Sequence, residues 1–211
     1  MNLIERLHER YVKSRRVGAL AASIAPLFPP EATVLDVGCG DGLLAEAMLR
    51  RRPDIQFRGI DVMARPDARI TVTKFDGARL PFPQESFDVV LFADVLHHTP
   101  HAEALLRDAR DVARHAVIVK DHCADGFLAW PTLRFMDRVG NARFGVALPH
   151  LYLRWDEWQR MFSELGMAVA TIRRRLELYP RPLTWLFDRS LHFVAVVVRA
   201  EAAAAGQHGV H

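Results

Sequence analysis

The stretch that decides the fold is Val34-Leu35-Asp36-Val37-Gly38-Cys39-Gly40-Asp41-Gly42, which joins an apolar strand to the start of a helix. Its alternating glycines let the backbone approach a ligand without a Cβ in the way, and the following helix presents free N–H groups at its start. Dinucleotide-binding turns read G-x-G-x-x-G and hold pyrophosphate, whereas this turn reads G-x-G-x-G. Asp36 would repel pyrophosphate and suits a ligand with an ammonium group and no phosphate.

Apolar strand-like runs alternate with helical patterns along most of the chain, which is typical of an open parallel sheet covered by helices. We therefore predict an α/β fold, Rossmann-like and doubly wound, with a mostly parallel seven-stranded sheet and an inserted lid after strand five. The expected strands are residues 33–37, 57–61, 70–75, 87–93, 116–119, 168–173 and 192–199. The expected helices are residues 3–27, 43–51, 102–113 and 156–165.

A single domain accounts for residues 1–200 in this prediction. Residues 1–28 form a helical cap at its N-terminus. Residues 122–154 interrupt the strand–helix alternation with aromatic residues and prolines, and we interpret them as a lid that packs on the domain and covers an acceptor molecule. Residues 201–211 have little apolar surface to bury, so we expect a frayed tail.

Composition excludes several classes of protein. The chain has 211 residues, of which 50% are hydrophobic, and a formal net charge of +3, so it is not disordered as a whole. The chain has only two cysteines, Cys39 and Cys123, which are too few for a disulfide-stabilised scaffold of this length. The sequence has neither an apolar stretch long enough to cross a membrane nor a signal peptide, so we expect a cytoplasmic protein. Basic residues are scattered rather than gathered in a stripe with aromatics, so no nucleic-acid partner is expected. The oligomeric state stays open.

Two further carboxylates follow expected strands. Asp61 ends the strand at residues 57–61, about 20–25 residues after the glycine turn, where an acid can hold the hydroxyls of a ribose. Asp76 ends the next strand and opens the run D-G-A-R-L-P-F at residues 76–82. Because ligands in open α/β sheets sit at the carboxyl ends of strands, Ala93 and Asp94 also lie where a cofactor and a substrate should meet.

These motifs, with F-D-V-V-L-F-A-D-V-L-H-H at residues 87–98, resemble the class I S-adenosylmethionine-dependent methyltransferases over residues 16–198. The resemblance is strongest to the bacterial small-molecule group that includes the ubiquinone and menaquinone methyltransferases. It implies S-adenosyl-L-methionine as cofactor, with Asp61 on the ribose, Val62 and Met63 against adenine, and Asp76 and Gly77 at the adenine end. The cofactor residues expected in full are Asp36, Gly38, Cys39, Gly40, Asp61, Val62, Asp76, Gly77 and Ala93.

Catalytic residues are harder to read, because a sulfonium is already a good methyl donor and the protein chiefly aligns donor and acceptor. His98, Asp121 and His122 are candidates for accepting a proton from an acceptor hydroxyl. The alternatives are that the histidines shape the pocket and that residues 120–122 form a turn before a helix. Adjacent histidines face different ways, so at most one of His97 and His98 should reach the pocket. No metal is expected, because the carboxylate-rich metal site of catechol-type methyltransferases is not evident.

The function predicted from these patterns is direct in-line transfer of a methyl group to a small, apolar or aromatic acceptor. One alternative is a protein that binds S-adenosylmethionine without turnover. A second is an NAD-dependent oxidoreductase, which should show G-x-G-x-x-G and no acid before the first glycine. Nucleic-acid or protein methylation is a third, although the Asn-Pro-Pro-aromatic tetrapeptide of amino-methylating enzymes is missing after the fourth strand, where Ala93-Asp94-Val95-Leu96 stands.

Overall fold

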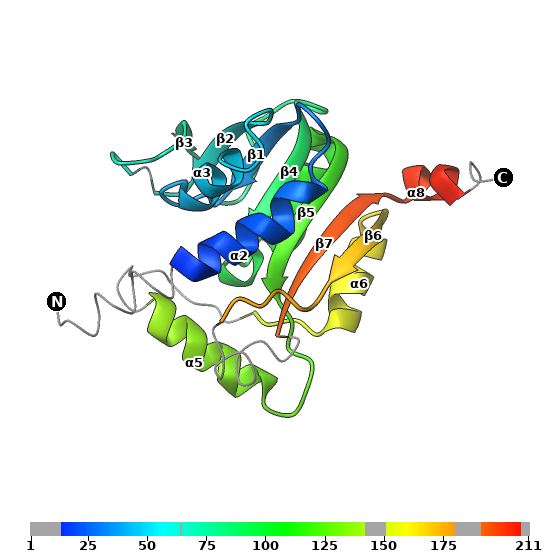
Figure 1. Ribbon diagram of the computed structural model, residues 1–211. Helices are drawn as coiled ribbons and strands as arrows, with labels where there is room; N and C mark the ends of the chain where they lie inside the picture. The colour runs from blue at the N-terminus through cyan, green and yellow to red at the C-terminus, as the bar shows by residue number, and fades with distance from the viewer. Residues whose placement is uncertain (1–13, 64, 142–150, 180–190, 208–211) are drawn as a thin grey trace.

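The computed structural model describes residues 14–63, 65–141, 151–179 and 191–207. Its centre is a seven-stranded sheet of order β3-β2-β1-β4-β5-β7-β6 (Figure 1). The five strands from β1 to β5 run parallel to one another, and β7 runs antiparallel to both β5 and β6. The predicted mostly parallel, doubly wound sheet is therefore confirmed. The strands are β1 Thr33–Val37, β2 Gln56–Asp61, β3 Val72–Lys74, β4 Phe87–Ala93, β5 Ala113–His122, β6 Met167–Arg173 and β7 His192–Arg199.

Helices cover both faces of the sheet because the strands alternate their apolar side chains between two cores. Leu35 and Val37 of β1 join a core with α4 and α6, whereas Val34 joins a second core with α2 and α3. Burying each large apolar side chain contributes about 1.5–3 kcal/mol. The helices are α2 Ser14–Ile24, η2 Ala25–Leu27, α3 Leu43–Leu49, η3 Leu96–His98, α4 Ala102–Val112, α5 Ala129–Asn141, α6 Trp155–Glu164 and α8 Ala200–Gln207.

The fifth strand is longer than predicted, and this changes the surroundings of two candidate residues. We expected residues 116–119, but β5 runs from Ala113 to His122 because it pairs along its length with β4 on one side and β7 on the other. Asp121 and His122 therefore lie inside a buried strand, opposite Phe193 and His192 of β7. The interpretation of residues 120–122 as a turn is wrong.

Edge and terminal segments also differ from the prediction. The third strand, expected at residues 70–75, is reduced to β3, which pairs only with β2 at the edge of the sheet. The N-terminal helix, expected at residues 3–27, is seen as α2 followed by the short helix η2, and residues 1–13 lie outside the described part. Residues 200–207, most of which were expected to fray, form α8 beyond the end of β7 (Figure 1).

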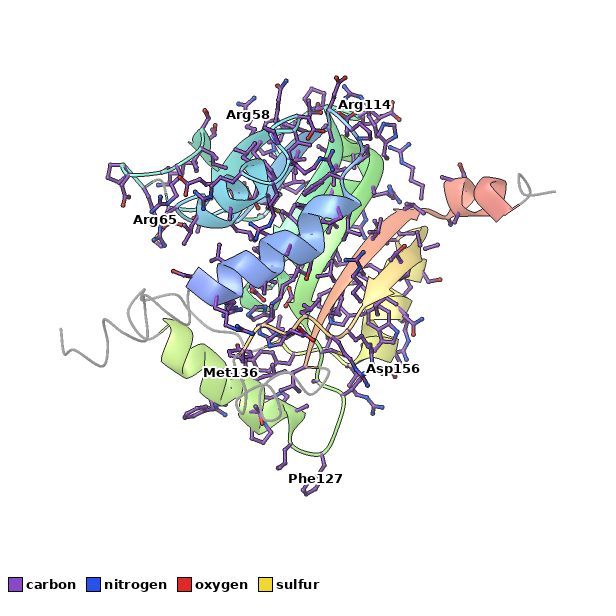
Figure 2. All side chains as sticks on the ribbon, viewed as in Figure 1. Arg58, Arg65, Arg114, Phe127, Met136 and Asp156 are labelled. Carbon is purple, nitrogen blue, oxygen red and sulfur yellow. The ribbon has the colours of Figure 1, made fainter. Side chains whose placement is uncertain are left out.

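The insert after β5 contains α5, which lies beyond the arrowhead of β5 (Figure 1). Its inner face packs Ala129 and Leu133 against Tyr152 and Leu191. Phe127, just before the helix, is 98% exposed and points away from the sheet, far from Arg114 at the opposite edge (Figure 2). Residues 142–150 of the predicted lid lie outside the described residues, so the lid stays a prediction. No helix in the described ranges is long and apolar enough to cross a membrane.

Candidate functional site

The glycine turn between β1 and α3 has the geometry that its sequence predicts. Gly38 and Gly40 have φ of +70° and +59°, in the left-handed region that glycine tolerates best. A Cβ on Gly38 would lie 2.6 Å from Cγ2 of Val95, so this glycine is required for packing. A Cβ on Gly40 would meet nothing within 4 Å, so the turn has open space on that side. The turn therefore has one face packed on the protein and one face available to a ligand.

Asp61, at the end of β2, organises the same turn. Its Oδ2 accepts a hydrogen bond from the Gly40 N–H at 2.8 Å, and its Oδ1 accepts one from the Met63 N–H at 2.8 Å. The next two residues, Val62 and Met63, leave apolar side chains 49% and 43% exposed. A Cβ on Gly77 would lie 2.8 Å from Val62, so the two positions expected at the adenine end are neighbours. The structure thus brings together the residues predicted at the ends of β2 and β3.

Asp36 is buried at the carboxyl end of β1, where its ionisation is costly. Burial, and then the nearby charge of Asp61, raise the pKa of its carboxyl to about 7. A cation placed beside this carboxyl would favour its charged form. Partial burial is the main cause that raises the pKa of the Cys39 thiol, so Cys39 is not a reactive thiolate. A Cβ on Gly59 would lie 2.5 Å from the Cys39 sulfur, which agrees with Cys39 filling the turn.

Asp76 begins a tight turn after β3. Its Oδ1 accepts hydrogen bonds from the N–H groups of Ala78 at 2.8 Å and Arg79 at 3.0 Å. These backbone donors stabilise the charged form and lower the pKa of the carboxyl. The structure therefore gives Asp76 a definite local role in the turn, and contact with an adenine amino group stays a prediction.

A cluster of charged side chains lies at the carboxyl ends of β4 and β5, beside Ala93. Asp94, with φ of +60°, accepts hydrogen bonds from Arg16 at 2.7 Å and from the fully buried Lys120 ammonium. Burial raises the pKa of the Asp94 carboxyl, but Lys120 and Arg16 outweigh it and hold that pKa well below its usual range. Burial lowers the pKa of Lys120. Lys120 also lies 3.5 Å from Nδ1 of His192 in β7.

Next to this cluster, two histidines converge on one carboxylate. His97 Nδ1 lies 2.6 Å from Asp121 Oδ1 and 3.3 Å from His122 Nδ1, and all three side chains are buried. Burial raises the pKa of Asp121, but His97 and the other hydrogen-bond partners outweigh it and lower that pKa. Burial is also the main cause that lowers the pKa of His122, so its imidazole is neutral at pH 7. The arrangement can accept a proton or hold a cation.

The histidine pair after β4 differs from the expectation. His97, rather than His98, reaches Asp121, because the short helix η3 turns its buried side toward β5. The ring centroids of His97 and His98 are 3.7 Å apart, so the two rings do not face opposite ways. His192 was not predicted as a site residue, because it begins a mostly apolar strand. A histidine among buried strand residues was the signal that could have found it.

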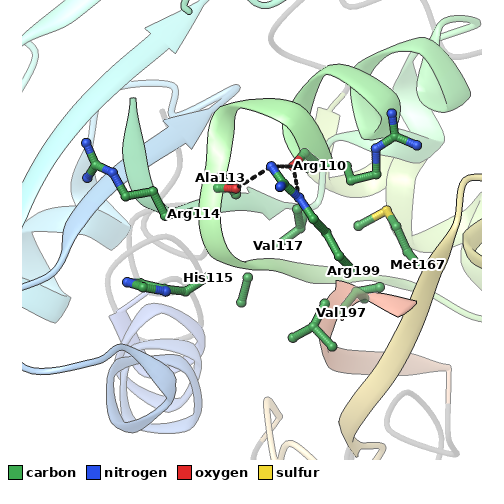
Figure 3. A pocket seen from close by; sticks show the side chains of 10 residues that line it. Arg110, Ala113, Arg114, His115, Val117, Met167, Val197 and Arg199 are labelled. Carbon is green, nitrogen blue, oxygen red and sulfur yellow. Dashed lines mark hydrogen bonds between the residues drawn. The ribbon is translucent and has the colours of Figure 1, made fainter. Parts of the chain in front are cut away.

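The hollow drawn in Figure 3 lies where β5 begins and β7 ends, at the opposite end of these strands from the candidate site, and it is separate from that site. It is lined by the beginning of β5 and the end of β7, and Arg199 crosses it to donate hydrogen bonds to the carbonyls of Arg110 and Ala113. These bonds join the end of β7 to α4 and the start of β5. The hollow is therefore structural.

The sheet order and the glycine turn define the Rossmann-like class of methyltransferase folds, and comparisons with known proteins agree. A family model described as a methyltransferase domain matches residues 7–189, so the chain belongs to that family. Two solved structures share the fold. A methyltransferase from Mesorhizobium loti has 16% identity and a TM-score of 0.63 over 85% of this chain and 97% of that one. The magnesium protoporphyrin IX methyltransferase of Synechocystis, solved with bound S-adenosylhomocysteine, has 17% identity and a TM-score of 0.60 over 94% and 88%.

Curated relatives match over shorter stretches. The 27-O-demethylrifamycin SV methyltransferase of Amycolatopsis mediterranei is 32% identical over 94 residues, which is 38% of this chain and 34% of that protein. The ubiquinone biosynthesis O-methyltransferase of Serratia proteamaculans is 35% identical over 88 residues, 36% of this chain and 35% of that protein. The matched part thus spans about a third of each relative. Membership of the family implies that S-adenosylmethionine is the cofactor.

Proposed function

We propose that this protein transfers a methyl group from S-adenosylmethionine to a hydroxyl oxygen of a small apolar or aromatic molecule. The observation that carries the proposal is a pair of features at the carboxyl ends of the parallel strands. One is the glycine turn with Asp36 and Asp61, and the other is the buried cluster of Asp121 with His97 and His122. The first suits a cationic nucleoside, and the second suits removal of a hydroxyl proton. Both curated relatives described above are named for methylation at oxygen.

The residues at the turn fit the cofactor. Asp36 would face a cationic group, and Asp61 would accept hydrogen bonds from the ribose hydroxyls. The backbone of Gly38, Cys39 and Gly40 would line the ligand on the open side of the turn. Val62, Met63, Asp76 and Gly77 are the proposed adenine contacts, and Ala93 is the proposed neighbour of the reacting centre. The cofactor supplies an electrophilic methyl carbon, so the protein needs no nucleophile of its own to carry the group.

His122 is the proposed proton acceptor, with Asp121 as its partner. Methylation of a hydroxyl would form a carbon–oxygen bond and break the methyl–sulfur bond of the cofactor, whose sulfur would keep the electron pair as S-adenosylhomocysteine. The hydroxyl proton would be released, and the neutral His122 imidazole can accept it. Asp121, 3.5 Å from His122 Nδ1, would stabilise the imidazolium that forms. His97 shares this carboxylate at 2.6 Å. His98 is kept as a candidate because its ring lies against that of His97.

Aromatic and aliphatic side chains next to this cluster support an apolar acceptor. The ring of Tyr152 has its centroid 5.9 Å from that of His97 and 6.0 Å from that of His122. Tyr152 packs in turn with Leu133 of α5, and with Trp130 at a centroid distance of 6.1 Å. An acceptor that reaches the histidines from this side would meet apolar surface, which disfavours charged acceptors because their desolvation is costly.

Purified protein tests the proposal when it is given S-adenosylmethionine and a panel of phenols, hydroxyquinols and aliphatic alcohols. We expect S-adenosylhomocysteine to form with a phenolic acceptor. His122→Ala and His98→Ala are compared with His115→Ala, which changes an exposed histidine at the opposite edge. If His122 is the base, His122→Ala lowers turnover at least about 100-fold while cofactor affinity by calorimetry stays near that of the wild type. Turnover in His122→Ala equal to that of His115→Ala would remove His122 from the mechanism.

A further inference from the structure

We propose that His97, Asp121 and His122 form a binding site for a divalent transition-metal ion, with Zn²⁺ as the best match. Three potential ligand atoms converge there: Nδ1 of each histidine and Oδ1 of the aspartate. Their mutual distances are 2.6, 3.3 and 3.5 Å. Around a tetrahedral zinc ion with bonds of about 2.0 Å, neighbouring ligand atoms are about 3.3 Å apart. A small outward movement of His97 would give all three pairs that spacing.

The types of donor select the ion. Two imidazoles and one carboxylate suit zinc and its first-row neighbours, whereas Mg²⁺ and Ca²⁺ prefer sites made of oxygen atoms. The three side chains are 0–3% exposed, so a bound ion would be shielded from bulk water. Three protein ligands leave a fourth position open, as in catalytic rather than structural zinc sites.

Backbone groups hold the ligands in place, as outer-shell hydrogen bonds do in established metal sites. The Leu96 N–H donates to Asp121 Oδ2 at 3.0 Å, which turns Oδ1 toward the histidines. The His122 carbonyl accepts a hydrogen bond from Trp158 Nε1 at 3.0 Å, from the helix α6. Asp121 and His122 lie on the central strand β5, and His97 lies on η3, immediately after β4. The site is therefore built on rigid elements.

The charges around the site leave the Asp121 carboxylate available to a cation. Lys120 and Arg16, the cations of the neighbouring charged cluster, form their ion pairs with Asp94. In the described ranges, the ion-pair partners of Asp121 are only the two imidazoles. A buried carboxylate needs a compensating positive charge, and a divalent ion between the imidazoles would supply it. Asp94 Oδ1 lies 3.9 Å from His122 Nδ1 and also pairs with Lys120, so it separates Lys120 from the proposed metal site.

The use of such an ion rests on the proposed function, although its binding does not. An acceptor hydroxyl in the open position would lose its proton more readily, because a zinc ion lowers the pKa of a bound oxygen. The ion and a free histidine base are thus two ways for the same cluster to prepare an oxygen for methylation. Binding experiments separate them without any assay of activity.

The test uses the full chain, freed of metal with a chelator and then titrated with Co²⁺ and Zn²⁺. We expect one Co²⁺ per chain to give the visible absorption of a four- or five-coordinate ion, and Zn²⁺ to displace it while Mg²⁺ does not. Asp121→Asn and His122→Gln should each weaken binding at least about tenfold, the range that even outer-shell changes reach. His115→Gln, which alters an exposed histidine, should bind like the wild type.

Two results would overturn the proposal. One is the absence of a stoichiometric Co²⁺ spectrum in the wild-type protein, which needs no variant and so does not depend on variants folding. The other is equal Co²⁺ affinity in folded Asp121→Asn and in the wild type, which would assign the ion to other histidines. Chelated protein that methylates a phenol and binds no Co²⁺ would remove the metal site and keep the proposed function. Protein that binds Co²⁺ and methylates nothing on the panel would keep the metal site and remove the proposed function.

Discussion

Replacement of Asp61 by alanine is the sharpest test of the cofactor site, because this carboxylate has two separable roles. It would accept hydrogen bonds from the ribose hydroxyls of S-adenosylmethionine. It also holds the turn, since its two oxygens accept the N–H groups of Gly40 and Met63 at 2.8 Å each. Asp61→Ala removes both roles, whereas Asp61→Asn keeps one carbonyl oxygen as an acceptor.

The expected size of the effect follows from these bonds. A hydrogen bond to a charged group contributes about 1.5–3 kcal/mol, and 1.4 kcal/mol corresponds to about tenfold in affinity. Loss of one such bond to ribose therefore weakens binding about 10- to 150-fold in Asp61→Ala. The freed N–H groups at the turn are near the surface and can bind water, so the loss of unfolding free energy should stay at about 1–2 kcal/mol.

Isothermal titration calorimetry with S-adenosylmethionine and S-adenosylhomocysteine measures the affinity, and thermal unfolding shows that each variant is folded at the titration temperature. Asp67→Ala removes an exposed acid from the same connection and serves as the control, with affinity expected within about twofold of the wild type. The reasoning is refuted if folded Asp61→Ala binds both compounds as tightly as Asp67→Ala does.

Three more predictions follow from the site. Affinity for S-adenosylmethionine should rise between about pH 6 and about pH 7.5, because Asp36, with its pKa raised to about 7, must lose a proton to face a cation. Calorimetry on Asp36→Asn should show weaker binding and an affinity that does not change with pH over this range. Denaturant titration should show a larger loss of unfolding free energy in Gly38→Ala than in Gly40→Ala, because only a Cβ at position 38 clashes with Val95. Both variants share the cost of about 1–2 kcal/mol for a left-handed residue, and Gly40→Ala should chiefly weaken cofactor binding. Lys120→Met should lower the unfolding free energy by about 3 kcal/mol, the low end for breaking a buried ion pair, again by denaturant titration. Equal stability of the two glycine variants, or a wild-type midpoint for Lys120→Met, would contradict these accounts.

The cofactor half of the fold could be predicted from the sequence because its information is local. The run from Val34 to Gly42 contains the strand, the positive-φ glycines and the helix start within nine consecutive positions. Asp61 could be placed for the same reason, since a strand end and a fixed distance from the turn determine its position. The parallel pairing of β1 with β2 then brings Asp61 to the Gly40 N–H.

The acceptor half could not be read in the same way, because it depends on pairing between distant strands. The last two residues of β5 pair only with β7, which begins seventy residues further along, and this pairing buries Asp121 and His122. The contact of Lys120 with His192 has the same origin. The choice between His97 and His98 depended on which side of the short helix η3 faces β5, and the pattern L-H-H does not determine this orientation.

The junction between β1 and β4 divides the sheet into two parts with different proposed roles. One part, from β3 to β1, supplies the groups proposed to grip the cofactor, and the other, from β4 to β7, supplies the cluster proposed to meet the acceptor. Only β1 and β4 pair across the boundary between them. If these proposed roles are right, substitutions in β7 or in the insert before α6 alter the choice of acceptor and leave the affinity for the cofactor unchanged.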